Sequence, residues 1–281
     1  MTLTRTALDA DWLGACRRSV KSLEAMLKAT PGTVERARET GTRGSGGDRT
    51  LLLDRDAESA VLAELDALHG QGYRFHVLSE ERGDIDYGDS GVRVIIDPID
   101  GSLNAKRDAL HYALSVAVAD GPTAADVAFG FVHDFGSGEQ WWAYRGQGAF
   151  RDGERLEPTA PERRARDGKL ELVGIESADP RWVAQSVAGL ENCAHRLRAL
   201  GTIASTLCQV AAARFDGMLT LSRARGVDAA AGQLIVREAG GLVSFTAFED
   251  PLGAPMDATP SSPLVAARSE QGLRELEAVR R

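Results

Sequence analysis

The chain has 281 residues, 43% of them hydrophobic and 26% charged, and a formal net charge of -8. This length allows one large domain or two small ones with a substantial core. The negative charge argues against a nucleic-acid partner, which normally requires a basic surface. The sequence has no apolar signal core, no apolar run of membrane-spanning length and only three dispersed cysteines. We therefore expect a soluble, cytoplasmic protein with reduced thiols and no membrane partner.

The N-terminal region is expected to be largely helical. Apolar residues at near-helical spacing predict a helix over residues 7–29, which Pro31 ends. Residues 43–48 (RGSGGD) predict a mobile connector, because they lack the pattern of a known phosphate-binding loop. A second helix should follow, with Asp54 and Glu58 one turn apart on the same face. Taken alone, Asp54 is a typical capping residue of such a helix.

Strands dominate the chain from residue 73 to about residue 150. Residues 73–78 alternate as a strand does and run into two adjacent glutamates, Glu80 and Glu81. Short glycine-rich turns separate the later strands, which favours antiparallel pairing. These later strands are predicted over residues 111–119, 126–133 and 140–144.

Residues 92–104 (VRVIIDPIDGSLN) carry the strongest chemical signal. The β-branched run at their start predicts a short buried strand. Pro98 restricts the residue before it to an extended conformation, so Asp97 should project from the strand end. Gly101 allows a tight turn directly after Asp100. A helix that begins at this turn would direct free N–H groups toward an anion.

The oxygen atoms of this segment suit a hard divalent cation. It supplies carboxylates, backbone carbonyls and the hydroxyl of Ser102, which are ligands that Mg²⁺ accepts. Carboxylates beside a bound phosphate would also need cations between them. A strand followed by an Asx-rich turn without any chemistry is the alternative, since Asp, Gly, Ser and Asn are common in turns.

The second half of the chain alternates strands and helices, which predicts an α/β layer. A charged, proline-containing segment separates the halves, so we predict an N-terminal α+β half over residues 1–153 and a C-terminal α/β half over residues 154–281. Asp228 stands at the start of a helix predicted over residues 227–239, where an N-cap role would be ordinary. The other predicted elements are strands 170–175, 195–200, 218–221 and 242–245, and helices 181–188 and 204–214.

The segment DPIDGSLN resembles the DPxDGTxN signature of the inositol monophosphatase-like phosphatases, whose superfamily includes fructose-1,6-bisphosphatases and bisphosphate nucleotidases. Further segments occur in the family's order: Asp48-x5-Asp54-x3-Glu58, the Glu80-Glu81 pair, GTIA at 201–204, and GVDAAAG…EAGG at 226–241. The resemblance extends from about Arg43, where the family has a lysine in a mobile loop, to the C-terminus. It implies a layered αβαβα sandwich, an α+β / α/β fold of the sugar-phosphatase type.

The resemblance also implies roles for individual residues, with most metal ligands in the N-terminal half and Asp228 completing the site from the C-terminal half. Two or three Mg²⁺ ions would be bound. The catalytic residues would be Glu80 and Ser102, which orient the attacking water, assisted by Asp54. The metal ligands would be Glu80, Asp97, Ile99 through its carbonyl, Asp100, Asp228 and Asp54, with Ser102 also near the first ion. The substrate would contact Gly101 and Ser102 through its phosphate, and Asp100 and Asp228.

The sequence departs from the inositol phosphatases at the substrate side. Their acidic residue seven positions before the final aspartate is Leu221 here, flanked by Arg223 and Arg225. These two arginines are predicted to bind the substrate at a second phosphate, and the alternative is that they are solvated loop charge. The resemblance further implies lithium sensitivity and a homodimer.

We therefore expect Mg²⁺-dependent hydrolysis of a small phosphate monoester, in the manner of an inositol-1-monophosphatase. The alternatives are a fructose-1,6-bisphosphatase or a 3′(2′),5′-bisphosphate nucleotidase. A non-catalytic protein that senses a phosphorylated ligand or binds a partner remains a further alternative from a different class.

Overall fold

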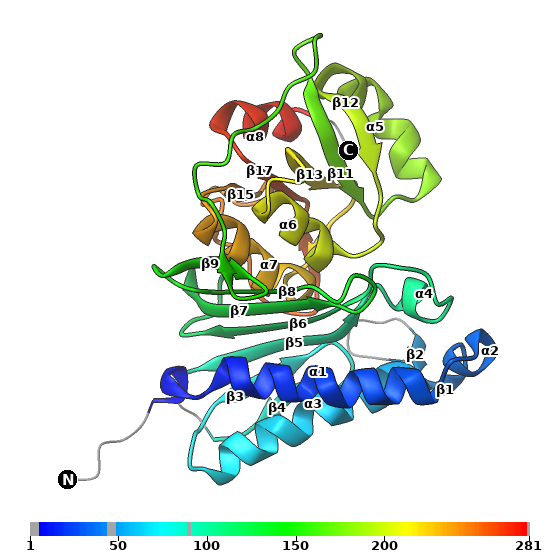
Figure 1. Cartoon of the computed structure of the whole chain (residues 1–281), viewed down its shortest axis with the longest axis vertical. Coiled ribbons are helices and arrows are strands. Elements are labelled where there is room, and N and C mark those ends of the chain that lie inside the picture. The colour runs from blue at the N-terminus through cyan, green and yellow to red at the C-terminus, as the bar shows by residue number, and fades with distance from the viewer. Residues whose placement is uncertain (1–5, 44–48, 89–90, 280–281) are drawn as a thin grey trace.

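The computed structural model describes residues 6–43, 49–88 and 91–279, with the backbone alone for residues 42, 43, 49 and 50. Helices and sheets alternate in layers along the longest axis of the molecule (Figure 1). The described helices are α1 (Trp12–Ala29), α2 (Thr33–Arg36), α3 (Leu52–Gly70), α4 (Ser102–Ala105), α5 (Pro180–Cys193), α6 (Ile203–Ala211), α7 (Gly226–Glu238) and α8 (Glu270–Glu277), with 3-10 turns η1 (Ala7–Asp9) and η2 (Ala124–Asp126).

The described strands form two large sheets and two small ones. The larger has eight described strands in the order β10-β9-β8-β7-β6-β5-β3-β4 and the other large sheet has five, β12-β11-β13-β17-β15. The strands are β1 (Glu39–Arg43), β2 (Arg49–Leu51), β3 (His76–Ser79), β4 (Gly83–Asp86), β5 (Arg93–Asp100), β6 (Ala113–Ala119), β7 (Val127–Asp134), β8 (Gln140–Tyr144), β9 (Gly148–Arg151), β10 (Glu154–Arg155), β11 (Leu170–Glu176), β12 (Ala194–Arg198), β13 (Gly217–Thr220), β14 (Ala224–Arg225), β15 (Leu242–Phe245), β16 (Pro260–Ser262) and β17 (Leu264–Ala267).

The outer helical layer consists of α1 and α3, which pack together and cover one face of the larger sheet (Figure 1). Asp11 caps α1 by accepting a hydrogen bond from the Gly14 N–H at 2.9 Å. The helix therefore begins at Trp12 and not at residue 7, and residues 7–9 form the separate turn η1. Buried apolar residues of both helices, such as Leu23 and Leu65, form a core with the sheet. The two predicted N-terminal helices are therefore confirmed.

The larger sheet confirms the predicted antiparallel pairing, since every pair of adjacent strands in it is antiparallel except β3 and β5. One expectation was wrong: the strand through Val94 does not end before Asp97 but continues to Asp100. The register with β6 shifts between these two aspartates. Pro98 has no N–H to give to the ladder, and an irregularity at this position accommodates it.

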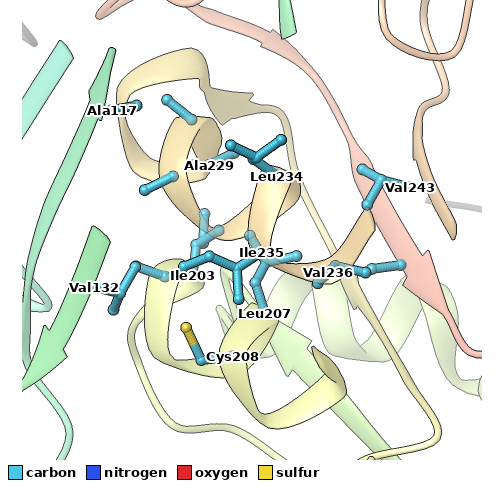
Figure 2. Close-up of a cluster of buried hydrophobic side chains, with 14 of the residues drawn as sticks. Ala117, Val132, Ile203, Leu207, Cys208, Ala229, Leu234, Ile235, Val236 and Val243 are labelled. Atoms are coloured by element: carbon cyan, nitrogen blue, oxygen red, sulfur yellow. The ribbon is translucent and has the colours of Figure 1, made fainter. Parts of the chain in front are cut away.

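The middle layer consists of α6 and α7, which lie between the two large sheets (Figure 1). Their side chains form a continuous core with residues of both sheets, including Val132 and Val243 (Figure 2). Close packing depends on glycine: a Cβ at Gly232 would lie 2.7 Å from Leu207 Cδ1. In this layer, α7, whose first turn carries Asp228, packs against β5, β6 and β7 of the larger sheet.

The second large sheet confirms the predicted α/β layer. Strand β11 pairs in parallel with β12 and β13, and β17 pairs antiparallel with β13 and β15. Helices α5 and α8 cover its outer face (Figure 1). Neither β17 nor α8 was predicted from the sequence pattern. The division of the chain after residue 153 stays a prediction. Among the described helices, none is long and apolar enough to cross a membrane.

Candidate metal centre

A small polar hollow of about 110 Å³ lies where several elements meet. The end of β5, the segment after β3, and the starts of α3 and α4 all contribute to it, together with Arg225 from β14. Its lining residues are Asp54, Glu80, Glu81, Asp97, Pro98, Ile99, Gly101, Ser102 and Arg225. Most of the residues predicted for the site are thus brought to one place from distant parts of the chain.

Three carboxylates converge at this hollow. Glu80, Asp97 and Asp228 each offer one oxygen, and these atoms all lie within 4.8 Å of one another. Asp97 is fully buried and Asp228 is nearly so. Like charges at this distance repel strongly in a buried site. A cation held between them is the arrangement that stabilises such a group.

Asp97 has the most demanding environment of the three. Its Oδ1 accepts a hydrogen bond from the Ile99 N–H at 3.0 Å, whereas Oδ2 is buried without any donor among the described residues. Burial raises the pKa of Asp97 well above its usual value, and the charges of Glu80 and Asp100 raise it further. A buried carboxylate oxygen without a hydrogen-bond partner lowers the stability of the fold. Such an unpaired oxygen is a feature of residues that bind a metal.

Asp100 is oriented by the N-terminus of α6. Its Oδ2 accepts hydrogen bonds from the Thr202 hydroxyl and the Ala204 N–H, both at 2.6 Å. Burial, followed by the charge of Asp228, raises the pKa of Asp100 well above its usual value. Asp100 thus lies close enough to Asp228 for their charges to interact, but it is not one of the three converging carboxylates, and one of its oxygens is already occupied by protein donors. Its role in a second metal site stays a prediction.

Asp228 is the third residue of α7 and not its N-cap, which is Arg225. The N-cap interpretation of this aspartate was therefore wrong. Burial raises the pKa of Asp228 to about 6, although the nearby Arg225 guanidinium lowers it. A hydrogen bond with the Arg225 backbone also lowers this pKa, so the side chain is tied to the start of the helix.

Asp54 caps α3 and also lines the hollow, whereas its role as a metal ligand stays a prediction. It is the third residue of α3, and its Oδ2 accepts a hydrogen bond from the Leu51 N–H at 3.2 Å. Its Oδ1 is buried without a hydrogen-bond partner in the described part of the chain. Burial, followed by the charge of Glu81, raises the pKa of Asp54 to about 7. The capping bond thus leaves one oxygen available for a ligand.

Glu58 positions the segment that carries Glu80. Its carboxylate accepts a short hydrogen bond from the Ser79 hydroxyl and another from the Arg82 N–H at 2.9 Å. Arg82 Nε also lies 2.7 Å from Glu58 Oε2. Residues on both sides of Glu80 and Glu81 are therefore tied to α3.

The turn at Gly101 requires glycine. Its φ is +91°, and a Cβ would lie 3.0 Å from the Gly201 carbonyl oxygen and 3.2 Å from that of His111. Ser102 follows as the first residue of α4 and lines the hollow. Because α4 is a single turn, its dipole is small, and the individual N–H groups of this turn are what could bind a phosphate.

Sequence reasoning missed Glu176 at the end of β11. This buried carboxylate accepts hydrogen bonds from the N–H groups of Leu200 and Gly201, both at 3.0 Å, and from the Thr206 hydroxyl at 2.6 Å. It thereby fixes the loop that holds Asp100. Burial raises the pKa of Glu176 to about 7. A single glutamate at a strand end has no sequence signal that distinguishes it from a solvated charge.

The two arginines predicted for the substrate side lie in different places. Arg225 forms ion pairs with Glu80 and Asp228 at the hollow. Arg223 is exposed and lines a larger adjoining cavity of about 650 Å³, together with Asp100, Glu176, Trp182 and Thr202. Leu221 is 1% exposed and belongs to the apolar core of the second sheet. A second-phosphate role for the arginines stays a prediction.

The donor set fits a hard divalent cation. All candidate ligands are oxygens, and the orphaned buried oxygens of Asp97 and Asp54 are of the kind that Mg²⁺ binds. Residues 44–48, with Asp48 among them, lie outside the described residues, as does the side chain of Arg43. The family-like roles considered for that segment therefore have no structural account.

The fold is a layered α/β architecture that solved structures share, and the family match and relatives below place the chain in a class of phosphatases. Residues 15–279 match the family model of the inositol monophosphatase family, and the chain belongs to that family.

Several relatives are similar over most of their length. A fructose-1,6-bisphosphatase/inositol-1-monophosphatase of Methanothermobacter thermautotrophicus is 33% identical over 244 residues, which cover 83% of this chain and 84% of the relative. A protein of the same name from Thermococcus kodakarensis is 30% identical over 270 residues, 96% of this chain and 97% of the relative. The Nus factor SuhB of Escherichia coli K12 is 33% identical over 231 residues, 81% of each chain.

Solved structures share the fold. An inositol monophosphatase–fructose 1,6-bisphosphatase aligns over 96% of this chain and all of its own, with a TM-score of 0.80 and 24% identity. An inositol monophosphatase of Thermotoga maritima aligns over 96% of this chain and 98% of its own, with a TM-score of 0.73 and 24% identity. The predicted layered sandwich is confirmed.

Proposed function

We propose that the chain hydrolyses a small phosphate monoester with Mg²⁺ as cofactor, in the manner of an inositol-1-monophosphatase. The observation that supports this most is the convergence of Glu80, Asp97 and Asp228, with a buried Asp97 oxygen that has no protein donor among the described residues. This group lies beside a turn that can offer N–H groups to a phosphate. The family assignment supports the same reaction class.

The carboxylates of the centre would bind the metal ions. A bound divalent cation would supply charge neutralisation on the phosphoryl oxygens and an activated water. Glu80, Asp97 and the Ile99 carbonyl would hold the first ion, and Asp97, Asp100 and Asp228 the second. Asp54 would bind a third ion more weakly.

The substrate's phosphate would lie against the N–H groups of Gly101 and Ser102. Ser102 and Glu80 would orient the attacking water, with Asp54 assisting. Because phosphoryl transfer is governed by positioning and electrostatic stabilisation, a fixed set of such groups accounts for most of the expected rate gain.

The rest of the substrate would occupy the adjoining cavity of about 650 Å³, which is large enough for a small ring. Asp100 and Thr202 offer polar contacts at its inner end, and Arg223 lies in its lining. This basic residue favours fructose 1,6-bisphosphate as the second candidate substrate, and two relatives carry a dual fructose-1,6-bisphosphatase/inositol-1-monophosphatase name. A bisphosphate nucleotide is the third candidate.

Phosphate release from a panel of substrates tests the proposal. Inositol 1-phosphate, fructose 1,6-bisphosphate, adenosine 3′,5′-bisphosphate and AMP would each be assayed with Mg²⁺ and with EDTA. We expect release that requires Mg²⁺ and that lithium inhibits. Preference for a bisphosphate that Arg223→Gln abolishes would assign the arginine to the second phosphate. No release from any compound, despite metal binding, would instead support a non-catalytic sensor or partner-binding protein.

The proposal includes a cytoplasmic homodimer, by analogy with the family. Light scattering coupled to gel filtration would measure the mass directly. The chain mass is 30.0 kDa, so a dimer would give twice this value.

A further inference from the structure

The Arg225 guanidinium lies against two of the three converging carboxylates. Its Nη2 is 2.8 Å from Asp228 Oδ1 and its Nε donates to Asp228 Oδ2 at 3.0 Å. Its Nη1 donates to Glu80 Oε1 in a short hydrogen bond. The side chain is only 18% exposed. A protein cation thus contacts the same carboxylates that the proposed function assigns to the metals.

The position of Arg225 in the chain makes this contact local and persistent. Arg225 is the N-cap of α7 and Asp228 is the third residue of the helix, so their side chains lie on one side of its first turn. One Asp228 oxygen accepts a hydrogen bond from Arg225 Nε, and the other lies within ion-pair distance of Nη2 but is buried without a hydrogen bond. The contact to Glu80 then joins α7 to the segment after β3.

We propose that Arg225 is a tethered cation that competes with the divalent metal for Glu80 and Asp228, so that metal loading displaces its guanidinium. This inference rests on the proposed function, because it requires that these carboxylates bind metal. Arg225 is then the residue that sets the metal affinity of the centre, and it contributes no ligand atom.

The competition follows from charge and from geometry. A carboxylate oxygen that accepts a guanidinium N–H bond, as Asp228 Oδ2 and Glu80 Oε1 do, is not available in the same direction to a cation. A divalent ion and a guanidinium also repel each other strongly at a few ångströms in a partly buried site. One of the two must leave the carboxylates when the other is bound.

Displacement would turn Arg225 toward an anion. Once released from Glu80, its guanidinium still projects from the start of α7 at a hollow that the phosphate-binding turn also lines. An anion that pairs with the released side chain favours the metal-loaded state. By linkage, such an anion must then raise metal affinity by the same factor as metal raises anion affinity.

Calorimetric titration of Mg²⁺ into the protein without substrate, at pH 8, tests the inference. Arg225→Gln removes the competing charge, and we expect it to bind Mg²⁺ about tenfold more tightly than the unmodified chain. Arg223→Gln is the matched control. Arg223 lies two residues before Arg225 and carries the same charge, but it has no described ion pair to the three carboxylates. Its affinity should stay within about twofold.

Inorganic phosphate provides a second readout. It should tighten Mg²⁺ binding in the unmodified chain more than in Arg225→Gln. If Arg225→Gln does not fold, Arg225→Lys replaces it: lysine keeps the charge but lacks the fork, so affinity should rise by a few-fold.

Mg²⁺ binding to the folded variant that is equal to, or weaker than, binding to the unmodified chain would overturn the inference, because Arg225 would then organise the carboxylates for the metal. Failure of the unmodified chain to bind Mg²⁺ at all would overturn the proposed function, and the inference with it.

Discussion

The middle helical layer and the carboxylate centre are both buried, and α7 contributes to both. In the layer, apolar side chains such as Leu234 and Ile235 fill the space between the sheets (Figure 2). The buried amide of Gln233 donates to the Ala124 carbonyl at 3.0 Å. At the centre, one turn away, buried carboxylates face one another and Asp97 keeps an oxygen without a donor among the described residues.

This difference separates the source of stability from the source of function. Burial of apolar surface stabilises the fold. Burial of like charges opposes folding and is tolerated only where a ligand offsets it. The core should therefore be sensitive to lost volume, and the centre to lost charge.

Removing one charge from the centre should have the largest effect on activity. Asp97→Asn keeps the size of the side chain but removes a ligand charge, and we expect phosphatase activity to fall at least about a thousandfold. The metal-free variant should be as stable as the unmodified chain or more stable, because a buried repulsive charge is gone. Assays of phosphate release and urea unfolding measure the two effects. Full activity in the folded variant would contradict the assignment.

Removing volume from the core should have the largest effect on stability. Leu207→Ala leaves a cavity between α6 and α7, which should lower the free energy of unfolding by about 2–5 kcal/mol. Activity at low temperature should remain, because the carboxylates keep their positions. Val187→Ala, at a 51% exposed position of α5, is the control and should change stability by less than about 0.5 kcal/mol. Equal losses in both variants would contradict the account.

Weakening the connection between the two regions should have an intermediate effect. Glu176→Gln cannot accept all of the hydrogen bonds that Glu176 accepts from the 200–206 segment, so Asp100 loses its fixed support. We expect kcat/KM to fall about 10–100-fold, with a higher Mg²⁺ requirement. Thr206→Val removes one of these bonds and should have a smaller effect. If both variants gave the same activity as the unmodified chain, the loop would have no positioning role.

A change of pH should have the mildest effect. Burial raises the pKa of Asp54 to about 7 and that of Asp228 to about 6, so both carboxyls hold protons below these values in the metal-free protein. A carboxyl group whose pKa is higher in the folded chain than in the unfolded chain adds to the free energy of unfolding when it is protonated. This contribution is complete below about pH 4, the pKa in the unfolded chain, and it is lost as the pH rises through 6–7.

Mg²⁺ must replace these protons, so its affinity increases over the same interval. We expect the Mg²⁺-induced rise in Tm to be larger at pH 8 than at pH 5. An equal rise in Tm at pH 5 and pH 8 would show that the raised pKa values do not control metal binding.

The sequence predicts the fold where local patterns are strong. Strand β8 and strand β15 have the bounds that alternation predicts, because their neighbours are clear turn residues. The strand through Asp97 is longer than predicted, since pairing with β6 outweighs the local effect of Pro98. Helix α8 was missed because its surface is mostly charged, with Leu276 buried against the second sheet.

The residues of the candidate site were likewise predicted from the sequence only where a local motif marks them. Motif spacing singles out Asp97, Asp100 and Asp228, because their segments have unusual local composition. It does not reveal that Glu176 supports Asp100, or that Arg225 contacts Glu80. Such contacts join residues as much as 145 positions apart, and only the folded chain specifies them.

The most direct test of the central claim is a crystal soaked in Mn²⁺, which accepts the same oxygen ligands as Mg²⁺. We predict an anomalous peak bounded by Glu80, Asp97 and Asp228, with the Arg225 side chain turned away from it. A map with no peak among these carboxylates, or with peaks only elsewhere, would contradict the assignment of this cluster as a metal centre.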